Sequence, residues 1–292
     1  MRWFVTGSEG QLGTALRRRL GELGEPCWGR DLELDVADPE AVADELASLP
    51  GGPPEVLVNA AAFTQVDRCE QEPELAARIN ALAPAGLARL CSERGIRFVH
   101  ISTDYVFDGE GEKPYREEDP PAPRSVYGHT KWQGERAAMA ECSELLLVRT
   151  SWVFGRGRNF IAAILGQAER VAAGEGALRV VDDQRGRPTY AQDLAEAIRV
   201  LVAGGHRGLF HFANDGEASW WDLARAVLDR SGYGGLEIER IATLALDLPA
   251  PRPRYSVLDL GKARKAGVPM RPWQEALEAY LASEDGSAVP VP

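Results

Sequence analysis

A tyrosine and a lysine four residues apart are the side chains of this sequence best suited to proton chemistry. Tyr127 and Lys131 stand in the pentapeptide YGHTK, and Thr103 precedes them in the run STDYVFDG. Residues four apart on a helix project from the same face, one turn above the other. A free phenol has a pKa of about 10, which a neighbouring ammonium lowers. The spacing predicts a proton donor or acceptor if a redox cofactor lies beside it, although a surface contact would show the same spacing.

A glycine-rich segment that could bind a dinucleotide follows a predicted strand at residues 2–6. TGSEGQLG places Gly7, Gly10 and Gly13 at three-residue intervals, just before a predicted helix at 11–23. Glycine lets the backbone turn tightly and approach a pyrophosphate, while the helix N-terminus supplies unpaired N–H donors. A plain tight turn would also use glycines, but a strand before and a helix after are the context of a dinucleotide-binding turn.

The choice between NADPH and NADH depends on the end of the second strand. There an acidic residue binds the ribose 2′-hydroxyl, or an arginine accepts a 2′-phosphate. The segment reads CWGRDLELDV, so Arg30 is the first charged residue and Asp31 lies beside it. One hypothesis is that Arg30 favours NADPH while Asp31 keeps NADH acceptable. The alternative is that Arg30 is a solvated loop cation.

Two further segments bring suitable residues to the ends of predicted strands. NAAAFT at 59–64 is rich in small residues, as a backbone passing a flat cofactor would be, and a buried strand end would also favour alanine. The strand 97–103 ends in Ser102 and Thr103, followed by Asp104. A hydroxyl at that point would lie at the carboxyl edge of a parallel sheet, where ligands of such sheets bind.

The alternation of apolar runs with helical patterns predicts an α/β fold with a Rossmann-like doubly wound parallel sheet. Asp38 followed by proline is typical of a helix start. We expect a dinucleotide-binding domain at 1–153, to which 190–214 returns, and a smaller, irregular α/β substrate domain at 154–189 and 215–284. A frayed tail is expected at 285–292. The strands and helices behind this expectation are strands at 2–6, 55–61, 97–103, 145–153 and 208–214, and helices at 11–23, 73–94, 159–174, 191–204, 219–231 and 272–283.

Composition excludes several classes of protein. The formal charge of −11 without a basic block argues against nucleic-acid binding through phosphates. Four scattered cysteines lack zinc spacing and predict reduced thiols, and no histidine shows metal-ligand spacing: His100 is expected to be packed and His129 exposed. No apolar run reaches membrane-spanning length and no signal peptide is evident, so we expect a cytoplasmic protein without membrane contact.

Taken together and in this order, the motifs resemble the extended short-chain dehydrogenase/reductase superfamily, and within it the dTDP-4-dehydrorhamnose reductase family. The stretches that carry the resemblance cover most of the chain: TGSEGQLG, VNAAAFTQVDRCEQEPELA, STDYVFDG, YGHTKWQGE, RTSWVFGRGRNF, DDQRGRPTY and RPRYSVLD.

The resemblance implies NAD(P)H-dependent reduction of the 4-keto group of dTDP-4-dehydro-β-L-rhamnose to dTDP-L-rhamnose. It implies that Tyr127 protonates the keto oxygen, that Lys131 lowers the tyrosine pKa and binds the nicotinamide ribose, and that Thr103 holds the substrate oxygen. Some members of the family are linked with magnesium through a glutamate just after the glycine motif, but Thr14 and Ala15 stand there, so no metal is expected. The other implied contacts are Gly7, Gly10, Gln11, Leu12 and Gly13 at the pyrophosphate, Asp35 and Val36 at the adenine, Ala62, Phe63 and Thr64 at the cofactor's centre, and Thr103, Asp104 and Trp152 at the dTDP-sugar.

Two other functions remain open at this stage. One is an NAD-recycling epimerase or dehydratase of the same superfamily, and the other is a non-catalytic regulatory subunit resembling that of methionine adenosyltransferase. Which arginine binds the substrate diphosphate stays open among several, and the chain is expected to be a monomer or a homodimer.

Overall fold

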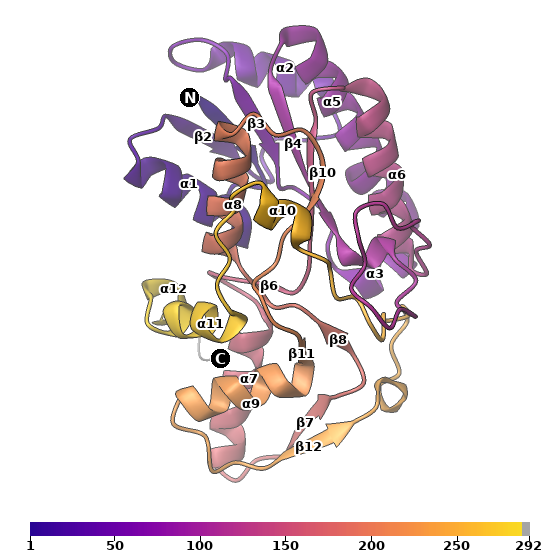
Figure 1. The fold of residues 1–292 in the computed structure, drawn as a ribbon, viewed down its shortest axis with the longest axis vertical. Helices are drawn as coiled ribbons and strands as arrows, with labels where there is room; N and C mark the ends of the chain where they lie inside the picture. Colours follow the sequence, from indigo (N-terminus) through magenta and orange to yellow (C-terminus); the bar gives the residue numbers. More distant parts are fainter. Residues whose placement is uncertain (288–292) are drawn as a thin grey trace.

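A six-stranded parallel sheet forms the larger part of the molecule in a computed structural model that describes residues 1–287 (Figure 1). Its strand order is β10-β5-β4-β3-β1-β2, so β1 pairs with both β2 and β3. The chain therefore reverses direction across the sheet beside β1, which is where open α/β sheets bind ligands. The strands are β1 (Trp3–Thr6), β2 (Cys27–Arg30), β3 (Val56–Asn59), β4 (Arg97–Thr103), β5 (Leu146–Thr150) and β10 (Gly208–His211).

Helices cover both faces of this sheet and confirm the doubly wound α/β prediction. On one face α1 and α8 pack against apolar strand residues, and on the other face α2, α5 and α6 do so. The Asp38 carboxylate caps α2 by accepting from the N–H groups of Glu40 and Ala41, as predicted. These helices are α1 (Gln11–Glu22), α2 (Pro39–Ser48), α5 (Ala83–Arg94), α6 (Val126–Glu141) and α8 (Ala191–Ala203).

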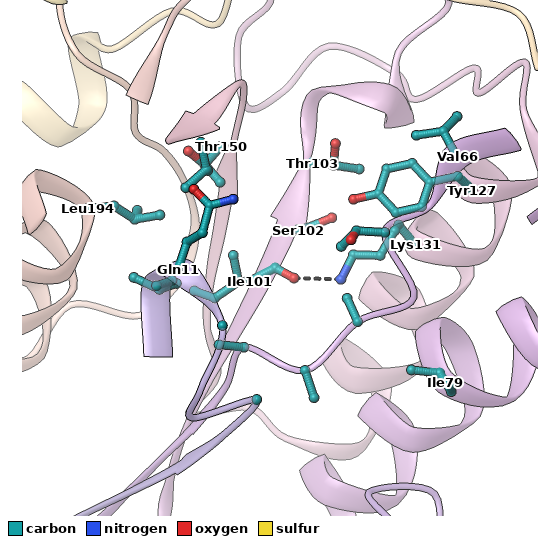
Figure 2. A pocket seen from close by; sticks show the side chains of 18 of the residues that line it. Gln11, Val66, Ile79, Ile101, Ser102, Thr103, Tyr127, Lys131, Thr150 and Leu194 are labelled. Atoms are coloured by element: carbon teal, nitrogen blue, oxygen red, sulfur yellow. Dashed lines mark hydrogen bonds between the residues drawn. The ribbon is translucent and has the colours of Figure 1, made fainter. Parts of the chain in front are cut away.

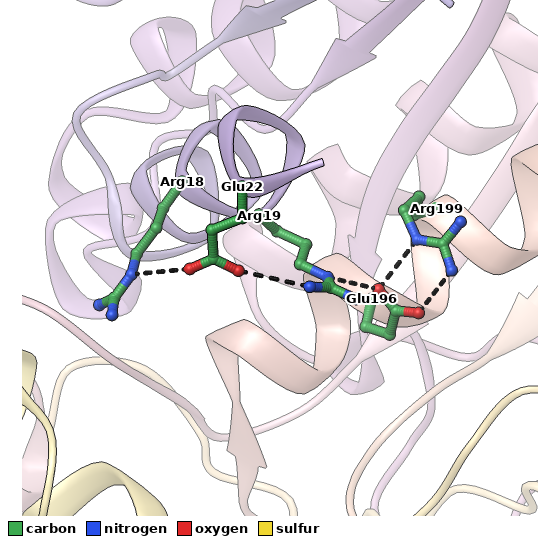
Figure 3. A network of polar contacts seen from close by, with 5 residues as sticks. All are labelled: Arg18, Arg19, Glu22, Glu196 and Arg199. Atoms are coloured by element: carbon green, nitrogen blue, oxygen red, sulfur yellow. Dashed lines mark hydrogen bonds and ion pairs between the residues drawn. The ribbon is translucent and has the colours of Figure 1, made fainter. Parts of the chain in front are cut away.

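Charged side chains join α1 and α8 along their exposed edges (Figure 3). Glu196 accepts from Arg19 at 2.8 Å and from Arg199 at 2.6 Å, while Glu22 pairs with Arg18 and Arg19. Both arginines lower the pKa of the Glu196 carboxyl group, the hydrogen bond of Arg199 most strongly. The network fixes α1, whose N-terminus follows the glycine turn, against the returning helix α8.

A smaller region at the other end of the molecule has its own apolar core and short strands (Figure 1). Parallel pairs β6–β9 and β7–β12 and the antiparallel pair β8–β11 make up its sheets. The division into two domains at the predicted boundaries stays a prediction. The elements are β6 (Val153–Phe154), α7 (Phe160–Ala172), β7 (Leu178–Val181), β8 (Arg185–Gly186), β9 (Thr189–Tyr190), β11 (Ala218–Ser219), α9 (Trp220–Arg230), β12 (Ile238–Ile241), α11 (Trp273–Leu281) and α12 (Glu284–Ser287). The short helix α10 (Gly261–Lys265) packs instead on the large sheet, where Lys262 donates to the Leu209 carbonyl of β10.

One strand, one helix and the C-terminal tail differ from the sequence prediction. The strand expected at 145–153 is broken after Thr150, because Trp152 has a positive φ of 48° that no strand continues. The helix expected at 73–94 is interrupted by a π-helical segment at Arg78–Leu82, between α4 (Pro73–Ala77) and α5. The short helix α3 (Val66–Gln71) precedes α4 in the chain.

The tail expected to fray from residue 285 instead begins as α12. The carboxylate of Asp285 is buried and lies 3.7 Å from the guanidinium of Arg18 and 3.5 Å from the amide of Gln192. These contacts tie Asp285 to α1 and α8. Residues 288–292 of the predicted tail lie outside the described residues.

Candidate active site

A cavity of about 1110 Å³ opens at the carboxyl edge of the parallel sheet, between the sheet and the smaller region. Ligand pockets for one small molecule usually measure roughly 300–1,000 Å³. The volume therefore lies just above the upper end of that range. Its lining comes from the segments after β1, β3, β4 and β5, from α6, and from loops of the smaller region.

The glycine turn after β1 is shaped for close approach. Gly7 has φ +67°, and a Cβ on it would lie 2.7 Å from the backbone nitrogen of Ala61. Any side chain at this position would push the two strand ends apart. Gly10 adopts the N-cap position of α1, and the neighbouring Gln11 leaves its buried Oε1 without a hydrogen-bond partner. A backbone held this tightly beside a helix N-terminus fits a pyrophosphate.

Tyr127 and Thr103 come together at the other side of the cavity, as Figure 2 shows. Tyr127 lies in the first turn of α6, which begins where the Ser125 hydroxyl caps the N–H of Gly128 at 3.1 Å. Burial raises the pKa of the Tyr127 phenol above its usual value, against the lowering effect of the Thr103 hydroxyl. The phenol is therefore protonated at neutral pH.

Lys131 lies one turn further along α6, with its side chain buried under the same cavity. Its ammonium donates to the carbonyl oxygen of Ile101 on β4 at 2.7 Å (Figure 2). Burial lowers the pKa of Lys131 to about 8, opposed by the charge of Glu135. Burial is the largest influence on the Tyr127 pKa and raises it, and the expectation that Lys131 lowers this pKa stays a prediction.

Asp104, the residue after Thr103, is a buried carboxylic acid of the same site. Its Oδ1 accepts from the Thr103 hydroxyl at 2.9 Å, and its Oδ2 is buried without a hydrogen-bond partner. Burial raises the pKa of Asp104 to about 6, although the hydroxyls of Ser256 and Thr103 lower it. Thr103 donates to Asp104 and accepts from the N–H of Tyr105 at 3.2 Å, which leaves one lone pair of its oxygen for another group in the cavity.

His100 and His129 lie as the sequence suggested. His129 is exposed on α6. His100 is fully buried, and its Nδ1 lies 3.1 Å from the amide nitrogen of Asn59. Burial and then the charge of Lys131 lower the pKa of His100 well below its usual value, so the ring is neutral packing behind the lysine.

The structure brings together most of the residues predicted for the site, but it leaves three outside the cavity. Gly13 lies behind the turn, where a Cβ would overlap the carbonyl oxygen of Gly7. Phe63 packs in the core while its backbone binds the Asn80 amide. Those that line the cavity are Gly7, Gly10, Gln11, Leu12, Asp35, Val36, Ala62, Thr64, Thr103, Asp104, Tyr127, Lys131 and Trp152.

Arg30 is the third predicted residue outside the lining. Its guanidinium lies 2.7 Å from the Glu45 carboxylate on α2 and donates to the Gly29 carbonyl. Asp31, by contrast, lines the cavity. Nearby, Asp35 pairs with Arg78 of the π-helical segment, so this end of the cavity carries both charges.

Sequence reasoning missed several lining residues because they come from distant segments. Trp220 enters from the first turn of α9, and Arg78 and Ile79 enter from the π-helical segment. Arg156 and Arg158 in the loop after β6, which the sequence left among several candidates for the substrate diphosphate, also line the cavity, and Gln11 donates to the Arg158 carbonyl at 3.3 Å. The local pattern around Trp220 predicts only a helix start, so nothing in the sequence pointed to the cavity.

Neither a metal cluster nor a membrane span accompanies this site in residues 1–287. Over that range no group of three or more His, Cys, Asp or Glu side chains could hold a metal ion, and no helix is long and apolar enough to cross a membrane.

Fold and site together define a Rossmann-like protein of the extended short-chain dehydrogenase/reductase class: a glycine turn at the sheet's reversal point faces a Thr-Tyr-Lys set across one cavity. The chain belongs to the family described as RmlD substrate binding domain, whose model matches residues 1–285.

Curated relatives and solved structures extend this result over nearly the whole chain. A probable dTDP-4,6-dihydroxy-2-methyloxan-3-one 4-ketoreductase of Streptomyces antibioticus is 43% identical, covering 96% of this chain and 95% of the relative. A dTDP-4-dehydrorhamnose reductase of Streptomyces griseus is 40% identical, covering 100% and 97%. The crystal structure of the Bacillus anthracis dTDP-4-dehydrorhamnose reductase in complex with NADP has a TM-score of 0.88 at 31% identity, covering 96% of this chain and 98% of that one.

Proposed function

We propose that this protein is an NADPH-dependent dTDP-4-dehydrorhamnose reductase, which reduces the 4-keto group of dTDP-4-dehydro-β-L-rhamnose to give dTDP-L-rhamnose. The observation that carries the proposal is one cavity lined by the glycine turn on one side and by Thr103, Tyr127 and Lys131 on the other. Relatives with the reductase name match over nearly their full length, and one solved relative holds NADP.

The cofactor would supply the hydride to the keto carbon when bound. The phenol of Tyr127 then gives its proton to the keto oxygen, because burial keeps it protonated. Thr103 places its hydroxyl beside the phenol, with its own proton directed to Asp104. Lys131 carries its charge below pH about 8 and stabilises the negative charge that the phenol acquires.

The remaining site residues take their proposed roles from their places in the cavity. Gly7 and Gly10 accommodate the pyrophosphate with Gln11, Leu12 and the turn-forming Gly13. Asp35 and Val36 lie at the adenine, Ala62 and Thr64 beside the cofactor's central portion, and Asp104 and Trp152 at the sugar. Phe63 supports this wall from behind, and Arg30 reaches a 2′-phosphate only after leaving Glu45.

The direct test is NADPH oxidation followed by absorbance with dTDP-4-keto-6-deoxyhexoses as substrates. We expect oxidation that depends on the sugar nucleotide, with dTDP-L-rhamnose as the product from dTDP-4-dehydro-β-L-rhamnose. No oxidation with any such sugar, together with co-purification of an adenosyltransferase, would support the regulatory-subunit alternative instead. We also propose that the protein works in the cytoplasm as a monomer or homodimer, which light scattering and cell fractionation would test.

A further inference from the structure

Trp152 has the most unusual backbone conformation of the described chain. Its φ of 48° makes it the one non-glycine residue with positive φ in the range 1–287. For a bulky residue this is a true outlier, and such conformations persist only where the surroundings enforce them. The strain breaks the strand between β5 and β6 and turns the indole toward the cavity.

The strained residue lies beside the reacting end of the site. Thr150, the last residue of β5, is the register partner of Thr103 on β4. Trp152 follows two residues later and lines the same cavity as Tyr127 and Thr103. Trp152 therefore follows the strand end that lies beside Thr103.

Two residues of the smaller region enclose the Trp152 indole. Trp220 stacks on it with ring centroids 3.7 Å apart and an interplanar angle of 8°. Gly186 on β8 lies against the ring as well, since a Cβ at this position would be 2.5 Å from Cε2. Any side chain at Gly186 would displace the indole, and loss of Trp220 would leave one of its faces unsupported.

Trp220 is itself fixed by polar contacts. Its Nε1 donates to Gln184 Oε1 at 3.0 Å, and the Gln184 amide donates to the Thr243 hydroxyl at 2.9 Å. The helix that carries it starts with a capping box, in which Ser219 and Asp222 satisfy each other's backbone N–H groups. The indole pair is thus a rigid wall of the cavity.

We propose that Trp220 is a positioning residue for the sugar subsite: stacked on Trp152, whose ring Gly186 also contacts closely, it holds the strained indole as an apolar wall against the 6-deoxy sugar. A 6-deoxyhexose has a methyl group in place of a hydroxymethyl group, and an indole provides matching apolar surface. This inference rests on the proposed function and adds to it the element that selects the sugar part of the substrate.

The central test replaces Trp220 by leucine in the full chain and measures steady-state NADPH oxidation. We expect the KM for the dTDP-4-keto-6-deoxyhexose to rise roughly 3- to 10-fold, because this factor corresponds to the free energy of one stacked aromatic pair. The KM for NADPH and the inhibition constant of dTDP, which lacks the sugar, are expected to stay unchanged. Trp221→Leu is the matched control, because Trp221 is the next residue of α9, donates to the Ile238 carbonyl and does not line the cavity.

Two more variants separate positioning from a general loss of structure. Trp220→Phe keeps an aromatic face and is expected to restore most of the sugar affinity. Gly186→Ala displaces the indole by contact with its Cε2 atom and is expected to raise the same KM. Parallel indoles at this distance couple in the far-ultraviolet circular dichroism spectrum, and this couplet should vanish in Trp220→Leu and remain in Trp221→Leu.

Three outcomes would overturn the inference: an unchanged sugar KM in folded Trp220→Leu, an equal rise in the KM for NADPH, or an equal effect of Trp221→Leu. A wild-type protein that oxidises no NADPH with these sugars would instead contradict the proposed function. In that case the circular dichroism couplet and dTDP-sugar binding by calorimetry still test the indole pair.

Discussion

Tyr127 is the residue on which the proposed chemistry depends most. Replacing it by phenylalanine removes the proton donor but keeps the ring packing against Tyr105, whose centroid is 5.4 Å away. We expect kcat to fall by roughly 10²- to 10⁴-fold, the usual contribution of general acid catalysis. NADPH binding, measured by fluorescence titration, should be retained. A variant with near wild-type turnover would show that another group delivers the proton.

Because Asp104 is buried, we expect a pH-dependent difference in the free energy of unfolding between the wild-type protein and Asp104→Asn. Its pKa is raised from 3.8 to about 6 by burial, so the folded protein binds this proton more tightly than the unfolded chain. Ionising Asp104 therefore costs stability, and the cost grows as pH rises from about 4 to about 6 and then stays constant. Asp104→Asn is expected to be more stable by up to about 3 kcal/mol at pH 7.5, at about 1.4 kcal/mol per pKa unit.

Urea unfolding at about pH 7.5 and about pH 4 would measure this difference. At the lower pH most of the stability gain should disappear, since Asp104 is then protonated in the folded protein and close to half protonated in the unfolded chain. Asp44→Asn on the exposed side of α2 provides the control for a simple change of surface charge. A gain that is the same at both pH values would contradict the account of Asp104 as a buried charge.

At the scale of elements, the ion pair between Arg30 at the end of β2 and Glu45 on α2 bears on the preference for NADPH or NADH. Glu45 on α2 holds Arg30 away from the cavity, while Asp31 faces it. Glu45→Gln should free Arg30 for a 2′-phosphate and raise the ratio of kcat/KM for NADPH over NADH. Because this ion pair is partly exposed, with 40% of the Arg30 side chain accessible, we expect a change of about 5-fold at most.

Steady-state kinetics with both cofactors would decide this, with Glu40→Gln in the first turn of the same helix as control. A ratio that falls in Glu45→Gln would mean that Arg30 does not reach the 2′-phosphate.

The helix that carries the catalytic pair depends on close packing. A Cβ on Gly134 of α6 would overlap the carbonyl oxygen of Asn80 in the π-helical segment. Gly134→Ala should therefore destabilise the protein by about 1–3 kcal/mol and lower kcat by shifting Tyr127. Gly21→Ala on α1 is the matched control, because nothing lies within 4 Å of the added carbon and alanine favours helices. Thermal unfolding should show opposite signs for the two variants.

The elements that local patterns define were predicted well from the sequence. The strands beginning near residues 2, 55 and 97 and the cap at Asp38 follow from apolar runs and a proline-marked helix start. The break at Trp152 and the π-helical segment could not be predicted, because contacts with distant parts of the chain enforce them. Trp152 is constrained by Trp220 and Gly186, and the π-helical segment by the close approach of α6.

At the scale of the whole molecule, the site exists only where the sheet and the smaller region meet. The sequence indicated the sheet side, since the glycine turn and the Tyr-Lys pair have recognisable spacing. It did not indicate Trp220, nor that Arg156 and Arg158 line the cavity, because those residues reach it through tertiary packing alone. Resemblance to a family supplied the substrate, and geometry supplied the arrangement of the groups around it.

Transfer of a labelled hydride is the most direct test of the central claim. NADPH carrying deuterium at the reactive position of its nicotinamide is incubated with dTDP-4-dehydro-β-L-rhamnose, and the product is examined by NMR and mass spectrometry. The account predicts one NADPH oxidised per sugar converted, with deuterium at C4 of dTDP-L-rhamnose. Conversion of the sugar without net NADPH oxidation and without deuterium at C4 would contradict it and indicate an epimerase or dehydratase that recycles its cofactor.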